Sequence, residues 1–386
     1  MSIVQNSFIR IALSILILIV LGHAKDEYHF KHISLEQGLS QSAVYSIYQD
    51  SQGFMWFGTE DGLNRYDGNR IKIYSHDPAD FTSLSNNTIY AILEDSNGFL
   101  WFGTHGGGLC KYDRSRDQFT TYRSTPLDST SLSTDYVFAI VEDPFHPGVL
   151  WVGTSRGFNI YDPEIDGFTT NMIDYEVSMD LTDYGIYTLF LDHQQTLWIG
   201  TDYGLASLNL EQGSFNLHLY DPDKPEGLSG NIIYAVHEDQ NNLVWVATGR
   251  GLNSFDRQSG TFGHYPSDPK NPESISNDLV YSIYTDYSGY TWFGTYKGLN
   301  KYDPRTQRFS RIFTNPINVG SISSDYILSL YSDRSQVLWI GTSSGGVNLH
   351  DLKHRKFSHQ KSDPGNPNSM SSNQVMAIYK DSSNMV

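Results

Sequence analysis

Short runs of apolar and alternating residues recur along this chain and are separated by turns rich in Gly, Asp, Asn and Ser. The clearest unit covers residues 84–122 and contains four such runs, at 89–94, 99–104, 109–112 and 118–122. Runs of this length with turn residues at both ends predict β-strands, which we call strands a, b, c and d of one unit. No segment shows the 3.6-residue apolar period of a helix.

The same unit repeats along the chain, and all 7 tryptophans mark its strand b. They are Trp56, Trp101, Trp151, Trp198, Trp245, Trp292 and Trp339, so their separations are 45, 50, 47, 47, 47 and 47 residues. A four-stranded unit at this interval is typical of a propeller blade. We therefore predict an all-β, seven-bladed β-propeller of four-stranded antiparallel blades with a partial eighth repeat. Repeats one to seven should close the ring, and strand a of the eighth should start a second propeller or dock beside residues 28–33.

Two positions of the repeat have sizes that suit a propeller. The large Trp of strand b can fill the wedge between neighbouring blades. A small residue in strand a fits the innermost strand, where blades converge and space is short. These small residues are Ser46, Ala91, Ala139, Thr188, Ala235, Ser282 and Ser329.

The turns also show local departures from the repeat. After strand a, the Gly-bearing turn is replaced by His193-Gln194-Gln195 in the fourth repeat and by Gln240-Asn241-Asn242 in the fifth. We expect a looser edge in those two blades. After strand b the turn reads W-[FVI]-G-T-x-x-G, and Ala247 takes the place of its first Gly once, so that position cannot require a positive φ.

The ends of the chain predict a three-part organisation. Residues 1–24 contain Arg10, an apolar stretch at 11–21 and a small-residue site at 22–24, which predicts a signal peptide or membrane-targeting segment. An uncleaved anchor is the alternative. The propeller should extend over 25–369 and a truncated eighth repeat over 370–386, which ends one residue before its expected Trp. We therefore expect the sequence to be an N-terminal fragment.

Composition excludes several classes of partner and chemistry. A formal net charge of −17 argues against nucleic acid and anionic lipid, which would be repelled at long range. Cys110 is the only cysteine, so no internal disulfide can form, and it takes the strand position that holds Asn64 or Asn159 in other repeats. We expect a structural role for Cys110.

Catalytic and metal-binding constellations are not evident. His350, His354 and His359 would share a face only on a helix, while the repeat places them on strands, so we expect no metal site. Acidic pairs such as Glu142-Asp143 occupy turns or strand ends found in every blade. The Gly-rich run 105–108 joins two strands and does not open a helix as a phosphate loop would. We expect neither catalytic residues nor a cofactor.

The pattern D-x-x-G-x-x-W-[FVI]-G-T-x-x-G-L-x-x-[YF]-[DN] resembles the two-component regulator propeller repeat, and the resemblance covers nearly all of the chain after the N-terminal segment. That family forms the extracytoplasmic sensor regions of bacterial sensor kinases, hybrid two-component regulators and some diguanylate cyclases. The resemblance implies a periplasmic or otherwise extracytoplasmic ligand-sensing module. It also implies that C-terminal signalling domains, with a histidine kinase or diguanylate cyclase activity, belong to the full-length protein.

Face parity predicts where a ligand would bind. In an up-and-down blade, the d-to-a linker and the b-to-c turn fall on one face, and loops on a rigid scaffold commonly carry binding residues. The flanks of the b-to-c turn repeat, whereas its middle pair varies. The candidate ligand-binding residues are Glu60, Asp61, His105, Arg156, Tyr203, Arg250, Tyr296 and Lys297. Aromatic, Arg and Lys side chains suit an oligosaccharide, particularly an acidic one, and we expect those from Arg156 onward to surround one mouth.

The sequence is compatible with three functions. The first is a sensor or binding module for an oligosaccharide or other small ligand. The second is an exported propeller enzyme such as a polysaccharide lyase or glycosidase, and the third is a protein-interaction scaffold. The sequence identifies neither the ligand, nor the output domain, nor whether the chain forms a homodimer.

Overall fold

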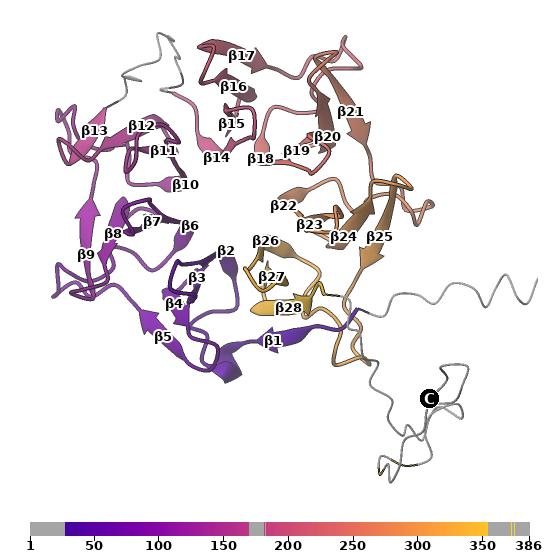
Figure 1. Ribbon diagram of the computed structural model, residues 1–386, viewed down its shortest axis with the longest axis horizontal. Helices are drawn as coiled ribbons and strands as arrows, with labels where there is room; N and C mark the ends of the chain where they lie inside the picture. The colour runs from indigo at the N-terminus through magenta and orange to yellow at the C-terminus, as the bar shows by residue number, and fades with distance from the viewer. Residues whose placement is uncertain (1–27, 170–180, 182, 354–371, 373, 375–386) are drawn as a thin grey trace, which may run out of the picture. The chain divides into compact units, whose positions relative to one another are not determined.

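The computed structural model describes residues 28–169, 181, 183–353, 372 and 374, and its strands form a closed ring of seven blades (Figure 1). The chain divides into a propeller unit, Met1–His350, and a C-terminal unit, Asp351–Val386. In the described part, each of the seven sheets has four antiparallel strands, which confirms the predicted fold. The expected targeting segment and almost all of the eighth repeat lie outside the described residues. Those described contain no helix that is long and apolar enough to cross a membrane.

Each blade runs from an inner strand at the centre of the ring to an outer strand at its edge. Blade 1 comprises β2 (Val44–Gln49), β3 (Met55–Thr59), β4 (Leu63–Tyr66) and β5 (Ile71–Tyr74), and blade 2 comprises β6 (Ile89–Glu94), β7 (Leu100–Thr104), β8 (Leu109–Asp113) and β9 (Gln118–Tyr122). Blade 3 comprises β10 (Val137–Glu142), β11 (Leu150–Thr154), β12 (Gly157–Asp162) and β13 (Gly167–Thr169), and blade 4 comprises β14 (Ile186–Leu191), β15 (Thr196–Thr201), β16 (Leu205–Asn209) and β17 (Ser214–His218). Blade 5 comprises β18 (Ile233–Glu238), β19 (Val244–Thr248), β20 (Gly251–Asp256) and β21 (Thr261–Tyr265), and blade 6 comprises β22 (Val280–Thr285), β23 (Thr291–Thr295), β24 (Gly298–Asp303) and β25 (Arg308–Ile312).

Blade 7 closes the ring with strands from both ends of the propeller. Its inner strands are β26 (Ile327–Ser332), β27 (Val337–Thr342) and β28 (Val347–Asp351), and its outer strand is the N-terminal β1 (Lys31–Ile33). β1 pairs with β28 in antiparallel register, with Ile33 opposite Val347. Residues 31–33 therefore complete the last blade, a role that the repeat pattern did not predict. The short 3-10 helix η1 (Leu35–Gln37) then leads into blade 1.

The small residues that recur in each repeat lie where neighbouring blades approach each other closely. A Cβ atom added to Gly58 would lie 2.7 Å from the backbone oxygen of Ile89 in the next blade and would also collide with Ser46. Space, and not a positive φ, therefore excludes a side chain at Gly58. Blade 5 differs, because Ala247 is fully buried at the same position, where it pairs with Ala235 and not with a larger Ser.

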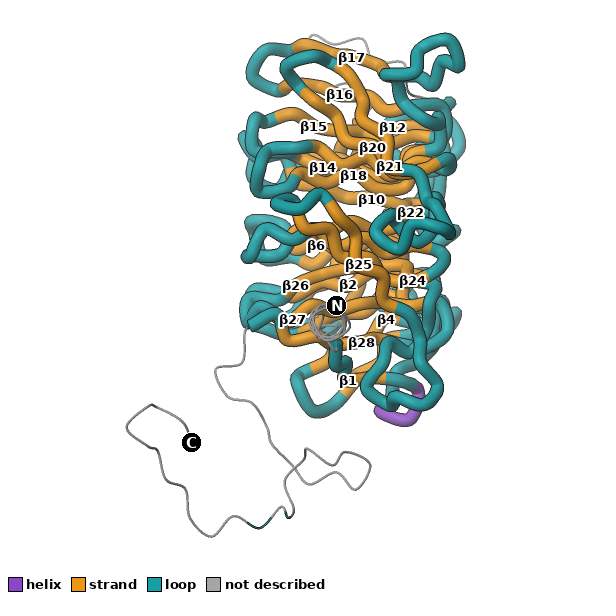
Figure 2. Tube along the Cα trace, turned by 90° about the vertical axis from the view of Figure 1, so that its right-hand side faces the viewer, coloured by secondary structure: helices purple, strands orange, loops and turns teal. Residues whose placement is uncertain are grey.

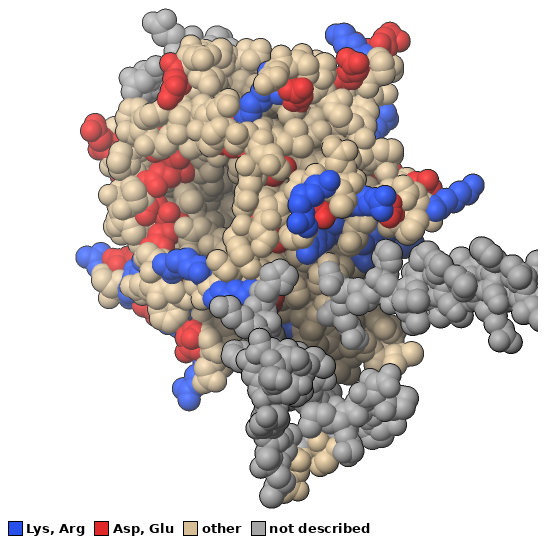
Figure 3. All heavy atoms as spheres, turned by 45° about the vertical axis from the view of Figure 1, so that its right-hand side comes forward, with Lys and Arg blue, Asp and Glu red and all other residues tan. Residues whose placement is uncertain are grey.

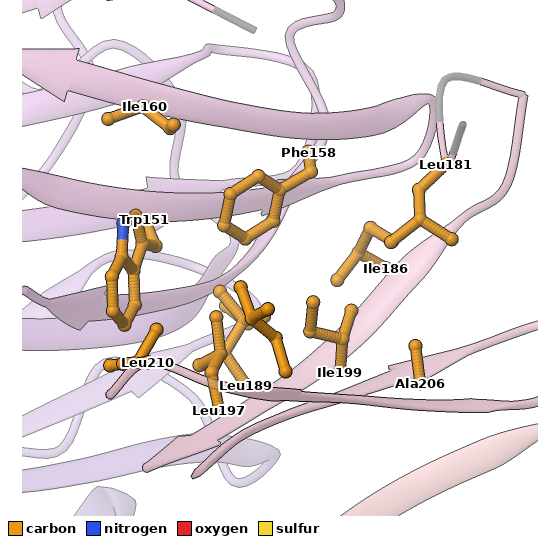
Figure 4. Packing of buried hydrophobic residues seen from close by; sticks show 12 residues of the cluster. Trp151, Phe158, Ile160, Leu181, Ile186, Leu189, Leu197, Ile199, Ala206 and Leu210 are labelled. Atoms are coloured by element: carbon orange, nitrogen blue, oxygen red, sulfur yellow. The ribbon is translucent and has the colours of Figure 1, made fainter. Parts of the chain in front are cut away.

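The tryptophans fill the wedges between blades, as predicted, because each of them is at most 5 % exposed. Trp151 of blade 3, for example, lies against Leu197 and Leu210 of blade 4 (Figure 4). Each of six indoles also donates its Nε1–H to Oδ2 of the Asp that opens the a-to-b turn, at 2.7–3.0 Å. These are Trp56, Trp101, Trp198, Trp245, Trp292 and Trp339. The carboxylate therefore links the turn to the wedge.

We expected a looser edge in blades 4 and 5, but their a-to-b turns are hydrogen-bonded like those of the other blades. In both blades the turn keeps its Asp–Trp hydrogen bond, and Gln195 (φ 56°) and Asn242 (φ 64°) adopt the left-handed conformation that Gly53 adopts in blade 1. The Oδ1 atom of Asp192 accepts hydrogen bonds from the backbone N–H groups of Gln194 and Thr196. These bonds hold the turn even though its left-handed residue is not Gly.

Replacing Gln195 with Gly should therefore raise the free energy of unfolding by about 0.5 to 1 kcal/mol, because Gly adopts a positive φ without steric cost. The substitution also removes a buried amide oxygen that has no hydrogen-bond partner among the described residues. Gln194→Gly, one position earlier in the same turn, is the matched control and should give no gain. Urea titration of both variants measures the difference. Equal effects would mean that the left-handed backbone is not strained.

Candidate functional site

The d-to-a linkers and the b-to-c turns share one face of the propeller, which we call the linker face. In Figure 2 the purple helix η1, which belongs to a linker, marks this face, and the opposite side carries the a-to-b and c-to-d turns. In blades 1, 2, 3, 6 and 7, backbone hydrogen bonds join this turn to the linker that leads into the next blade. Gly62 donates to the backbone oxygen of Asn87 at 2.7 Å, and Gly298 donates to that of Asp325 at 2.6 Å.

A repeated polar network fixes the shape of each b-to-c turn. In blade 1 the Thr59 hydroxyl donates to the Gly62 oxygen at 2.8 Å and lies 3.0 Å from the Ser40 hydroxyl, and Asn64 accepts from the Ser40 backbone N–H at 2.9 Å. In blade 2 Cys110 replaces the Asn, and its Sγ lies 2.9 Å from Ser85 Oγ. Burial raises the pKa of the Cys110 thiol. This places Cys110 in a strand, as predicted, and not as an activated nucleophile.

Aromatic side chains surround the inner end of the linker face. The second residue of strand a lies at a register irregularity and is aromatic in six blades, and in blade 7 Tyr326 packs against the preceding ring. The seven residues, which we call the aromatic collar, are Tyr45, Tyr90, Phe138, Tyr187, Tyr234, Tyr281 and Tyr326. Their successive ring centroids are 4.8, 5.6, 5.5, 6.5, 5.3 and 5.2 Å apart. Because strand a is innermost, the collar lies at the centre of the ring.

The first residue of the variable pair in the b-to-c turn lies beside the collar in the two blades where this residue has a ring, His105 in blade 2 and Tyr296 in blade 6. The His105 ring is 5.5 Å from Tyr90 and 4.9 Å from Tyr136, and the Tyr296 ring is 4.9 Å from Tyr326. Burial, together with the Glu60 carboxylate, raises the pKa of the Tyr90 hydroxyl. The Tyr90 hydroxyl therefore keeps its proton at neutral pH and can donate a hydrogen bond.

In blades 1, 4 and 5 the second residue of the pair contacts a linker instead. Asp61 accepts from Asn87 Nδ2 at 2.9 Å, the Tyr203 ring stacks on Tyr184 at 4.8 Å, and the Arg250 guanidinium lies 5.2 Å from the Tyr220 ring. Arg156 and Lys297 occupy the same turn position and are exposed. The candidate residues thus form two zones, an inner one at the collar and an outer one over the linkers.

The collar itself was missed in the sequence, although its signal is present. An aromatic residue precedes the small residue of strand a in six repeats, as in Tyr45-Ser46 and Phe138-Ala139. In a strand of alternating apolar residues these aromatics resemble ordinary core positions. Only the ring geometry shows that they meet one another.

The opposite face of the propeller has a hollow of about 450 Å³, lined by residues that include Tyr48, Glu94 and Glu142. In Figure 3 acidic side chains lie along one side of a hollow in the surface. The glutamates there join neighbouring blades. Glu94 accepts from the Ser51 hydroxyl at 2.5 Å, and Glu142 accepts from the Ser96 backbone N–H at 2.9 Å. Because these groups hold the blades together, we place the candidate site on the linker face.

Within the described ranges, no group of three or more His, Cys, Asp or Glu side chains is arranged to hold a metal ion. His350 packs against the rings of Tyr28, Phe30 and Trp292. His354 and His359 lie outside the described residues.

Comparison with protein-family models identifies the repeats. Six segments match the model described as two component regulator propeller, at residues 38–61, 83–106, 180–203, 227–250, 274–297 and 321–344. The chain carries two component regulator propeller repeats. The six matched segments include the fourth and fifth repeats and omit the third, whose a-to-b turn is two residues longer, from Asp143 to Trp151.

Relatives of this two component regulator propeller include sensor proteins. The chain is 28 % identical to the extracellular domain of a hybrid two component system from B. thetaiotaomicron, with a TM-score of 0.70, and the match covers 84 % of this chain and 42 % of that one. A segment of 55 residues is 51 % identical to histidine kinase P4 of Formosa agariphila, which is 14 % of this chain and 4 % of the kinase. This chain therefore spans less than half of either relative.

An enzyme shares the fold of this propeller. The match to virginiamycin B lyase from Staphylococcus aureus has a TM-score of 0.61 at 13 % identity, and it covers 85 % of this chain and 100 % of the lyase. At this identity the likeness extends to the fold alone.

Proposed function

We propose that this chain is the extracytoplasmic ligand-sensing propeller of a two-component or cyclic-diguanylate signalling protein and that it binds an oligosaccharide on the linker face. The aromatic collar is the observation that carries this proposal. Seven neighbouring rings on a closed scaffold form a wide, rigid surface on which a pyranose ring can stack. The similarity to extracellular domains of two component systems supports the sensory role and the export of the chain.

The side chains around the collar suit sugar recognition. Tyr296 lies half-exposed at 53 % next to Tyr326, and Tyr187 is 36 % exposed in the collar, so both offer ring surface to a ligand. His105, the tyrosine hydroxyls and the Glu60 carboxylate supply donors and acceptors for sugar hydroxyls. Each such hydrogen bond contributes a net of about 0.5 to 1.5 kcal/mol, so several are needed for useful affinity.

Ligand binding can be tested with the purified chain by isothermal titration calorimetry against a panel of neutral and acidic oligosaccharides. We expect Tyr296→Ala to weaken binding of the best ligand by about tenfold, because the substitution removes an exposed ring on which a sugar can stack. Phe145→Ala is the matched control, because Phe145 is also exposed at 49 % but lies in an a-to-b turn on the other face. Equal affinities of the two variants would place the site elsewhere.

A propeller enzyme is the second candidate, because the lyase shows that this fold also occurs in an enzyme. The two functions differ in their effect on the ligand. A sensor leaves the bound oligosaccharide intact, whereas a lyase or glycosidase shortens it. Mass spectrometry of the oligosaccharide after incubation with the purified chain separates them, and cleavage would favour the enzyme.

A further inference from the structure

Negative charge lies next to the collar. Glu60 and Asp202 hold the first position of their b-to-c turns, the position that contacts the collar at His105 and Tyr296. Asp202 is oriented by a hydrogen bond from the backbone N–H of Gly185 to its Oδ1 at 3.2 Å. Both carboxylates are exposed, so they can reach a ligand that rests on the rings.

The same two carboxylates contribute to raised pKa values of three collar tyrosines. Burial and the Asp202 carboxylate raise the pKa of Tyr187, and burial and Glu60 raise that of Tyr90. Burial also raises the pKa of Tyr45, with further contributions from Tyr90 and Glu60. The carboxylates therefore act on collar residues in blades 1, 2 and 4.

Several basic side chains of the linker face lie against the linkers. The Arg250 guanidinium lies over Tyr220, which follows the outer strand of blade 4. Arg123 pairs with Asp135 at 3.7 Å, and Arg311 donates to the backbone oxygens of Asp268 and Asn271. These contacts hold the positive charges over the linkers, in the outer zone.

We propose that the aromatic collar selects an uncharged oligosaccharide over a uronate-containing or sulfated one. Its rings stack with a pyranose, Glu60 and Asp202 accept hydrogen bonds from the sugar hydroxyls, and the same carboxylates repel anionic sugars. This inference rests on the proposed function and specifies its ligand. It replaces the expectation of an acidic sugar, because Arg250, one of the basic residues behind that expectation, lies over a linker.

The test uses pairs of ligands that differ only at C6, where a neutral hydroxymethyl group is replaced by a carboxylate. A panel of neutral tetrasaccharides and the same tetrasaccharides oxidised at C6 to uronates is titrated into the purified chain at low ionic strength, where the screening of exposed charges is weakest. We expect the best neutral ligand to bind at least about tenfold more tightly than its oxidised partner. The double variant Glu60→Gln, Asp202→Asn should reduce that ratio several-fold, with a melting temperature close to that of the parent.

The results distinguish the selectivity for neutral sugars from the binding of oligosaccharides as such. Equal or tighter binding of the oxidised partner would overturn the inference and leave the proposed function in place. An unchanged ratio in the double variant would show that the two carboxylates do not set the selectivity, which also overturns it. If no member of either series binds, the oligosaccharide-binding function itself fails.

Discussion

Replacing Trp245 with Ala should lower the free energy of unfolding by about 3 to 5 kcal/mol, the usual cost of removing a large buried aromatic side chain. The Trp245 ring is fully buried and contacts Tyr265, Phe293 and Tyr302, with centroids 4.9 to 5.1 Å apart. Phe293 and Tyr302 belong to the next blade, so the substitution opens a wedge between two blades. It also removes the donor to the buried Asp239 carboxylate.

A second substitution separates these two contributions. Trp245→Phe keeps an aromatic ring in the wedge but loses the indole N–H, so it should cost less than Trp245→Ala and leave the Asp239 carboxylate without that donor, at about 1 to 3 kcal/mol. Phe145→Ala on the surface should change stability by less than about 0.5 kcal/mol. Guanidinium titration monitored by tryptophan fluorescence and circular dichroism measures all three. A cost below about 1 kcal/mol for Trp245→Ala would show that the wedge is not closely packed.

The fold was predictable because three positions of the repeat indicate how closely neighbouring blades pack. The regular spacing of Trp56 to Trp339, the small residue of strand a and the Gly of the b-to-c turn all report the narrow space between blades. These three constraints act within about 50 residues of chain and recur in every repeat, except that Ala247 replaces the Gly in the fifth. A single sequence therefore sufficed for the architecture.

The site was predictable only in part. The order of strands in a blade assigns each turn to a face of the propeller, but it does not orient the side chains of that turn. The linker face follows from counting strands, yet the division of the variable pairs into inner and outer zones depends on packing. His105 contacts Tyr136 in the linker that leads into the next blade, whereas Arg250 lies over Tyr220 in the linker that leads into its own blade. Such contacts between a turn and a linker about 30 positions away have no local sequence signal.

In blades 4 and 5 the a-to-b turn forms without Gly at its left-handed position. The absence of Gly suggested a looser edge, but the buried Asp at the start of each turn fixes the backbone strongly enough for Gln195 and Asn242 to adopt a positive φ. The hydrogen bonds of the Asp thus override the local preference of the residue that follows.

Deleting residues 28–33 should destabilise the whole ring, because β1 is the outer strand of blade 7. The deletion removes Phe30 and Ile33, which are 2 % and 6 % exposed, and burial of two such side chains is worth about 3 to 6 kcal/mol. It also removes the Phe30 N–H to Gly320 hydrogen bond of 2.8 Å and leaves β28 as an unpaired edge. We expect a large fall in the melting temperature and aggregation of the deleted chain.

A peptide of residues 28–35 added in trans tests whether the loss results from an open ring. If β1 acts by pairing with β28 and filling the space beside Val347 and Trp339, the peptide should bind the deleted chain and raise its melting temperature in a concentration-dependent manner. A peptide with Ile33→Asp should fail, because that side chain would bury a charge in the same cluster. A peptide with Lys31→Ala, whose side chain is exposed, should bind like the parent. If the deleted chain melted like the full one, closure of the ring would not depend on its N-terminal strand.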